Sequence, residues 1–272
     1  MNSKSKKGLM TLTESSIMIA LSTVLSVLPL FKMPYGGSIT MASLLPIVVV
    51  AYRHDEKVGL GTALVTAMLQ MLLGLENFSY FSTWQSLLVL AVLDYVVAFL
   101  VFGLSGICRR FIADQRVAMA TGATLACLCR YFCHVISGAT IWAGLSIPTE
   151  AAFIYSLGYN ATYMIPETIV LAVAAYYICS AVDFSKETPT RAKKFTTDGN
   201  IALIKVISGL SIFVGIIVDT ILVFSKLQDA ETGDFVITNL ANVDWVAFTI
   251  VTVVCIGAAV ILHLVDKKKE NK

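Results

Sequence analysis

The chain has 272 residues, of which 57% are hydrophobic and 14% are charged, and its mean hydropathy is +0.80. A soluble domain has about a quarter of its residues charged, so this composition excludes a soluble protein and predicts a polytopic protein of the lipid bilayer. The formal net charge of +2 is too small to indicate a nucleic-acid partner.

Eight apolar stretches are candidate membrane-spanning segments, since a span needs about twenty such residues. The second stretch is shorter, so we expect it to begin earlier in the chain or to lie tilted among its neighbours. We expect every stretch to be helical, because unpaired backbone groups are too costly in lipid and the runs are too long for barrel strands. The candidates are residues 11–31, 39–52, 57–75, 82–107, 117–145, 151–181, 199–226 and 243–266.

The basic residues predict how these helices are oriented. With the amino terminus inside, sixteen of the twenty lysines and arginines fall on the cytoplasmic side, and only Lys32 and Lys226 fall outside. The polar, proline-containing residues 183–198 are then a cytoplasmic linker. The sequence predicts an all-α integral membrane protein with both termini cytoplasmic: a six-helix membrane domain (1–182), the linker, and a two-helix transmembrane extension (199–272).

Three ionisable residues lie at one level inside predicted spans. Asp94, Arg130 and Glu167 are each about 20 Å from the cytoplasmic end of their own helix, at 1.5 Å per residue. A charged group at this depth costs roughly 2.5 to 3.5 kcal/mol on insertion scales, so it pairs with another or faces a cavity. We expect one buried network, and an ion cluster that only fixes helix packing is the alternative.

Polar and aromatic residues gather on the outer side of this level. Arg130 and His134 are four residues apart and share a helix face, with Trp142 two turns further on. A cavity with aromatic sides and a carboxylate at its base suits a flat cation. For Trp84 and Trp142, the alternative is a place in the aromatic belt of the membrane interface. The candidates are Trp84, Tyr95, His134, Trp142, Tyr155, Tyr159, Asn160 and Tyr163.

Motifs for enzymatic chemistry are absent from the sequence. It contains no ATP-binding P-loop, no H-E-x-x-H zinc motif and no G-x-S-x-G nucleophile motif. The six cysteines lack the spacing of a metal site or a disulfide framework, and the three histidines are scattered. We therefore predict neither an enzyme nor a cofactor or metal site.

Four stretches carry a family pattern: Leu12-Thr13-Glu14, Tyr35-Gly36, Leu93-Asp94-Tyr95, and the block Arg130-Tyr131-Phe132-x-His134…Gly138…Trp142 followed by Tyr155-Ser156-Leu157-x-x-Asn160. In these stretches the sequence resembles the thiamine-specific substrate-binding subunits (S components, the ThiT group) of energy-coupling factor (ECF) vitamin transporters. The similarity runs from about Leu12 to Asp183, and the last block is its most specific part.

The resemblance implies a subunit of the bacterial cell membrane that captures thiamine, or a related vitamin, from outside. Delivery inward would require a shared transmembrane T subunit and two ATPase subunits. The resemblance also implies that His134, Tyr155 and Asn160 hydrogen-bond the aminopyrimidine ring and that Trp142 stacks on a ring. Tyr95 matches the family residue directly.

Several positions depart from the family pattern. Asp94 stands where the family has glutamate, and Arg130 stands where a lysine is usual, so the charges are kept while reach and geometry change. Trp84 takes an aromatic position of the family. Gly37 stands where the family has a tryptophan in the first outer loop, which removes one stacking surface and leaves a related pyrimidine vitamin as an alternative ligand.

The first helix offers a docking surface. Ser16 and Ala20 form a small-x-x-x-small pattern, which permits close helix approach, at the place where the family docks on its membrane partner. The extension lies outside the six-helix family unit. Two other functions stay open: a membrane sensor or scaffold that binds a ligand without transport, and an ion-coupled carrier with Asp94, Arg130 and Glu167 as a proton relay, although no inverted repeat is visible.

Overall fold

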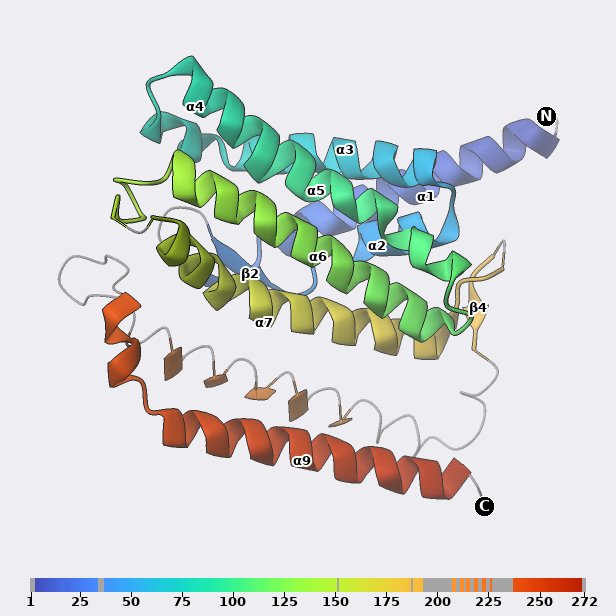
Figure 1. Ribbon diagram of the computed structural model, residues 1–272. Helices are drawn as coiled ribbons and strands as arrows, with labels where there is room; N and C mark the ends of the chain where they lie inside the picture. The colour runs from blue at the N-terminus through green and yellow to red at the C-terminus, as the bar shows by residue number, and fades with distance from the viewer. Residues whose placement is uncertain are drawn as a thin grey trace. The chain divides into compact units, whose positions relative to one another are not determined.

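The structure is a computed structural model that describes residues 3–33, 37–150, 152–186, 188–192 and 237–270, together with short pieces between 207 and 226. The chain divides into two compact units, Met1–Tyr176 and Tyr177–Lys272 (Figure 1).

Helices dominate the first unit. In chain order they are α1 (Ser3–Ser26), α2 (Leu45–Arg53), α3 (Glu56–Leu73), the 3-10 turn η2 (Leu75–Tyr80), a long segment from Trp84 to Arg110, α6 (Gln115–Thr140) and α7 (Ala152–Ala181), whose last residues belong to the second unit. The long segment is α4 (Trp84–Val89), the π-helical η3 (Leu90–Val97), α5 (Ala98–Leu100) and the 3-10 helical η4 (Val101–Arg110). π-helical turns are often found at functional sites, and η3 carries both Asp94 and Tyr95.

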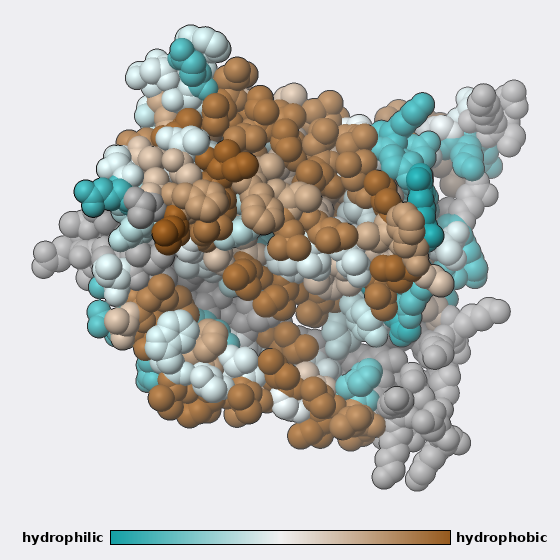
Figure 2. Space-filling model, viewed as in Figure 1, coloured by the Kyte–Doolittle hydropathy of each residue, from teal (hydrophilic) through white to brown (hydrophobic). Residues whose placement is uncertain are grey.

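Six helices of the described chain are long and apolar enough to cross a membrane. They are Ser5–Ser26, Glu56–Leu73, Trp84–Arg110, Gln115–Thr140, Ala152–Ala181 and Trp245–Val265. Figure 2 shows hydrophobic side chains over the middle of the helices of the first unit and hydrophilic ones toward their ends. The predicted helical membrane fold is therefore confirmed, whereas the predicted span 199–226 falls largely outside the described residues.

The prediction that every apolar stretch is helical was wrong between the first two spans. Helix α1 ends at Ser26, and the chain then forms an antiparallel hairpin of β1 (Pro29–Lys32) and β2 (Ser38–Thr40). Pro29 disfavours continuation of the helix, because its ring clashes with the preceding turn. Non-helical backbone at membrane depth is tolerated where it lines a cavity, and residues of this hairpin line the cavity described below. The predicted second span is thus one strand followed by the nine-residue helix α2.

Helices of the first unit approach each other closely at glycine residues, which have no side chain. A Cβ atom on Gly103 of η4 would lie 2.6 Å from the carbonyl oxygen of Gly59 on α3, and a Cβ on Gly106 would meet the backbone of Ala51 on α2. Small residues allow such contacts between helices in a membrane, where packing replaces the hydrophobic effect as the source of association.

Ion pairs join α1 to the end of α2, and η4 to the start of α3. Glu14 of α1 accepts hydrogen bonds from Arg53 at the end of α2 and pairs with His54 at 3.1 Å. Arg110 pairs with Glu56 at 2.5 Å. The first set of contacts holds the end of α2 against α1, and the second holds the last turn of η4 against the first turn of α3.

The second unit contains the predicted linker and extension as far as they are described. Strand β3 (Val182–Asp183) pairs antiparallel with β4 (Thr190–Arg191), and the turn η6 (Ile237–Asn242) precedes α9 (Trp245–Glu270). Ser211 donates to the carbonyl oxygen of Cys255 at 3.2 Å, and Thr252 donates to Asp219 at 2.7 Å. Short helical pieces between residues 207 and 226 thus contact α9 through small and polar side chains.

Candidate functional site

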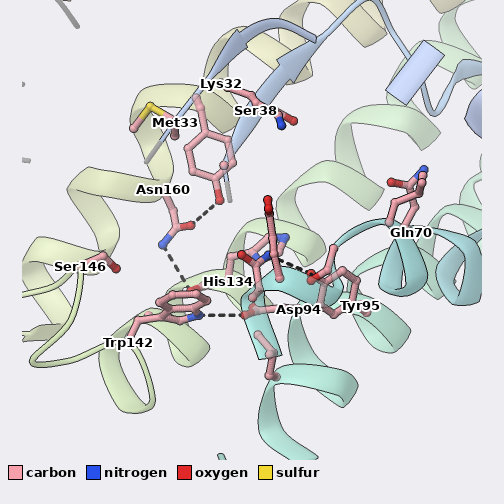
Figure 3. A pocket seen from close by; sticks show the side chains of 18 of the residues that line it. Lys32, Met33, Ser38, Gln70, Asp94, Tyr95, His134, Trp142, Ser146 and Asn160 are labelled. Carbon is pink, nitrogen blue, oxygen red and sulfur yellow. Dashed lines mark hydrogen bonds and ion pairs between the residues drawn. The ribbon is translucent and has the colours of Figure 1, made fainter. Parts of the chain in front are cut away.

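A cavity of about 410 Å³ opens among the hairpin, α3, η2, η3, α6 and α7. It brings together eight of the candidate residues predicted from the sequence. These are Asp94, Tyr95, Arg130, His134, Trp142, Tyr159, Asn160 and Tyr163, and Figure 3 shows the side chains of Asp94, Tyr95, His134, Trp142 and Asn160 gathered around the cavity.

Asp94 is held by three donors at the base of the cavity. Its Oδ1 atom lies 2.9 Å from Nδ1 of His134, and its Oδ2 atom accepts from the Ser137 hydroxyl at 2.7 Å and from the Trp142 indole Nε1 at 3.1 Å (Figure 3). The residue is only 8% exposed. Buried carboxylates are tolerated where hydrogen bonds replace water, so these donors explain how η3 keeps this group inside a span.

Arg130 and Asp94 are connected through His134. The Nε atom of Arg130 donates to Nε2 of His134 at 3.2 Å. Because a guanidinium only donates, Nε2 must accept, and the imidazole proton is assigned to Nδ1, which then donates to Asp94. The Arg130 guanidinium also lies 3.7 Å from Glu167 Oε2 and 4.8 Å from the centre of the Phe99 ring. The structure thus brings the predicted Asp94, Arg130 and Glu167 into one network, with the histidine between the first two.

Asn160 joins α6 to α7 beside this network. Its Nδ2 atom donates to the backbone oxygen of Ser156 at 2.9 Å and to that of His134 at 3.3 Å, and its Oδ1 atom accepts from the Tyr163 hydroxyl at 2.7 Å. A Cβ atom on Gly138 would collide with the Ser156 hydroxyl. The glycine therefore permits the close helix contact that places Asn160 at the cavity.

Tyr95 ties the segment that follows α3 to the long helix. Its hydroxyl accepts from Asn77 at 2.9 Å and donates to the backbone oxygen of Gly74 at 3.1 Å. The ring stacks on Phe78 with 5.8 Å between ring centres. These contacts fix η2 at one side of the cavity.

Sequence reasoning missed Tyr80, the last residue of η2. Tyr80 lines the cavity, and its ring centre lies 5.8 Å from that of Trp142, with an angle of 57° between the planes. Phe81 packs edge-on against the same indole at 5.0 Å. The segment has no periodic pattern that predicts this placement; the only sequence signal was a pair of adjacent aromatic residues in an outer loop.

Two predicted site residues are not at the cavity. Trp84 begins α4 and is 68% exposed, and Tyr155 lies half-buried on α7, one turn before Tyr159, which does line the cavity. Trp84 starts a helix directly after the loop, so its side chain follows the surface of α4, and Tyr80 takes the inner aromatic position. Tyr159 and Tyr163 supply the aromatic contribution of α7.

The remaining predicted positions lie on α1 and in the hairpin. Ser16 and Ala20 are exposed on α1. Tyr35 and Gly36 lie outside the described residues, whereas Gly37 lines the cavity. A Cβ atom on Gly37 would lie 3.0 Å from both Met33 and the Tyr163 ring, so a larger residue there requires one of these side chains to move by a few tenths of an ångström.

The site combines aromatic rings with a carboxylate, a guanidinium, an imidazole and an amide. This arrangement suits a planar ligand that carries positive charge or ring amino groups, because the rings offer stacking and cation–π contacts and the carboxylate offers a charged acceptor.

Comparisons with known proteins agree on one family. The family model described as "Thiamine transporter protein (Thia_YuaJ)" matches residues 12–185. A protein of Bacillus subtilis (strain 168) named "Thiamine transporter ThiT" is 33% identical over 178 residues, which cover 61% of this chain and 88% of that protein. A solved structure of ThiT from Listeria monocytogenes is similar with a TM-score of 0.52 and 22% identity, over 64% of this chain and 94% of that one. The last likeness concerns the fold alone.

Proposed function

The chain belongs to the thiamine transporter protein family, and from that membership we propose that it captures thiamine in the cavity between η3, α6 and α7. It is a multi-pass bacterial membrane protein and a transport protein rather than an enzyme. Its role would be that of the substrate-binding S component, which takes the vitamin from outside the cell.

The observation that carries this proposal is the pairing of Asp94 with Trp142 at the cavity. Thiamine joins an aminopyrimidine ring to a positively charged thiazolium ring. A carboxylate beside an indole offers both rings a partner, since the carboxylate attracts the cation and accepts from the ring amino group while the indole stacks. Among the described residues, Oδ1 of Asp94 accepts one bond and Oδ2 two, so Oδ1 retains a lone pair for a ligand.

The neighbouring residues have proposed roles in the same scheme. His134 and Asn160 would hydrogen-bond the aminopyrimidine, and Tyr80 would cover the ring that stacks on Trp142. Arg130 would act on the ligand mainly through His134, whose proton it directs to Asp94. The direct role of Tyr155 and Trp84 expected from the family pattern has no support from their placement away from the cavity.

Transport needs an energy source that this chain does not encode. Its sequence has no ATP-binding P-loop, so we propose that it works with a shared transmembrane T subunit and two ATPase subunits of an ECF transporter. Ser16 and Ala20, exposed on α1, would form the surface on which the T subunit docks, because small residues let a partner helix approach closely.

A ligand titration tests the proposed binding function. The purified protein is titrated with thiamine, its phosphates and the separate pyrimidine precursor, and tryptophan fluorescence is followed. We expect saturable quenching by thiamine that is reduced in Trp142→Phe and retained in Trp84→Phe. If the pyrimidine precursor binds and thiamine does not, thiamine is not the ligand. If the protein binds thiamine but cells that hold the ECF partners do not take thiamine up, the protein is a sensor and not a transport subunit.

A further inference from the structure

One buried contact joins the hairpin to α7 across 127 positions of the chain. The hydroxyl of Thr40, the last residue of β2, lies 3.0 Å from Oε1 of Glu167. Thr40 is 3% exposed and Glu167 5%. A hydrogen bond to a carboxylate shielded from water is among the stronger single contacts that a hydroxyl makes.

Neighbouring groups direct the Thr40 proton toward the carboxylate. The hydroxyl oxygens of Thr40 and Ser43 lie 2.8 Å apart, and the backbone N–H of Ser43 donates to Thr40 Oγ1 at 3.3 Å. A threonine hydroxyl has one proton and two lone pairs. An ionised Glu167 only accepts, so the arrangement is satisfied when Thr40 donates to it and Ser43 donates to Thr40.

The second carboxylate oxygen of Glu167 faces the cavity network. Oε2 lies 3.7 Å from Nη1 of Arg130 and, within the described part of the chain, accepts no hydrogen bond. Arg130 in turn lines the cavity and donates to His134. One carboxylate therefore touches both the hairpin and the arginine that orients the histidine at the ligand site.

The hairpin itself forms one side of the cavity. Lys32, Met33, Gly37 and Ser38 all line it. The strands are only four and three residues long, with a bulge between Pro29 and Phe31. A two-stranded hairpin of this length is marginally stable alone, so its closed position depends on contacts with the helices.

We propose that Thr40 and Glu167 are positioning residues, a latch that holds the β1–β2 hairpin against α7 and Arg130 and so limits the rate at which the ligand leaves the cavity. The part that concerns the ligand rests on the proposed function. The part that concerns the hairpin does not, because it follows from the contact between β2 and α7.

Two variants separate the latch from the cavity residues. Thr40→Val keeps the shape and buried volume of the side chain but removes the hydroxyl, and Thr40→Ser keeps the hydroxyl. Thr66→Val is the matched control, because Thr66 is also buried in the first unit but donates within its own helix to Thr62 at 2.9 Å. Glu167→Leu removes the other half of the latch.

Hydrogen exchange of the hairpin amides is measured on the full-length protein in detergent without added ligand. We expect Thr40→Val to exchange about tenfold faster than the parent, the size expected for loss of a hydrogen bond to a charged group. Thr40→Ser and Thr66→Val should exchange like the parent. If Glu167→Leu folds, adding it to Thr40→Val should bring no further acceleration. Unchanged exchange in Thr40→Val would overturn the latch.

Thiamine dissociation is then followed by stopped-flow fluorescence on the same variants. We expect Thr40→Val to release thiamine about tenfold faster than the parent and Thr40→Ser to restore the parent rate. Faster hairpin exchange with an unchanged release rate would overturn the claim that the latch limits release. A parent protein that fails to bind thiamine would refute the proposed function, while the exchange measurement would still decide on the latch.

Discussion

The indole Nε1 of Trp142 donates to Oδ2 of Asp94 at 3.1 Å, although the two residues are 48 positions apart. The bond makes the aromatic ring and the carboxylate one rigid unit, since it fixes the orientation of the indole plane. The same carboxylate also accepts from Ser137 and His134. Contacts from η3 to α6 and to the residues that follow it therefore depend on a single side chain, the same one that we propose for the ligand.

Replacement of Asp94 should affect both binding and stability. In Asp94→Asn one acceptor oxygen becomes an NH2 group, which faces either the His134 donor or the Ser137 and Trp142 donors. We expect thiamine binding to weaken by roughly 1.5 to 3 kcal/mol, about ten- to a hundredfold, together with a lower Tm. Calorimetric titration and a thermal melt measure the two effects. Asp94→Glu keeps the carboxylate and should retain binding. Unchanged affinity with a much lower Tm would show that Asp94 is only structural.

Tyr80 and Trp84 form a matched pair of aromatic substitutions. Tyr80 lines the cavity and contacts Trp142, whereas Trp84 is exposed on α4. We expect Tyr80→Ala to weaken thiamine binding by about 0.5 to 1.5 kcal/mol, the value of an aromatic contact beyond area burial, and Tyr80→Phe to restore most of it. Trp84→Ala should bind like the parent. A loss confined to Trp84→Ala would instead favour the expectation from the family pattern.

The exposed small residues of α1 should matter for uptake and not for capture. Ala20→Trp places a large side chain on the proposed docking surface, at an exposed position that does not line the cavity, so the partner helix can no longer approach closely. We expect near-parent affinity for thiamine in the purified variant and little uptake in cells. Ala20→Gly is the control, because it leaves the surface small. Equal loss of binding and uptake in Ala20→Trp would exclude a docking role.

The orientation predicted from the basic residues is tested by labelling single cysteines in intact cells. Thr190 lies in β4 of the predicted linker, and Glu150 lies in the exposed loop between α6 and α7, which should face outward. A membrane-impermeant maleimide should label Glu150→Cys above the parent background and leave Thr190→Cys unlabelled until the cells are opened. Labelling of Thr190→Cys from outside would reverse the orientation.

The two-helix extension should be dispensable for capture. The family match ends at residue 185, and every residue that lines the cavity lies before that point. A chain that ends at Lys194 should therefore insert in the membrane and bind thiamine with near-parent affinity, as measured by fluorescence titration. A truncated chain that stays folded in detergent but does not bind would show that residues 199–272 contribute to the site.

The helical membrane fold and a common level for the buried charges could be predicted from the amino-acid sequence alone. Apolar runs longer than a bilayer is thick have one stable outcome, a helix that satisfies its own backbone. Counting at the 1.5 Å rise of an α-helix predicted one depth for Asp94, Arg130 and Glu167, and the structure joins these residues in one network through His134. Both inferences need only local geometry and the properties of lipid.

The connections among the buried charges, and the identity of the aromatic residues beside them, depend on how the helices pack. Depth along a helix does not determine rotation about its axis, so the place of His134 between Asp94 and Arg130 depends on how η3 and α6 pack. The hairpin before α2 and the inward position of Tyr80 depend on contacts far apart in sequence, such as Thr40 with Glu167 and Tyr95 with Gly74. Short loops have little conformational preference of their own, and they take the shape that the surrounding helices leave for them.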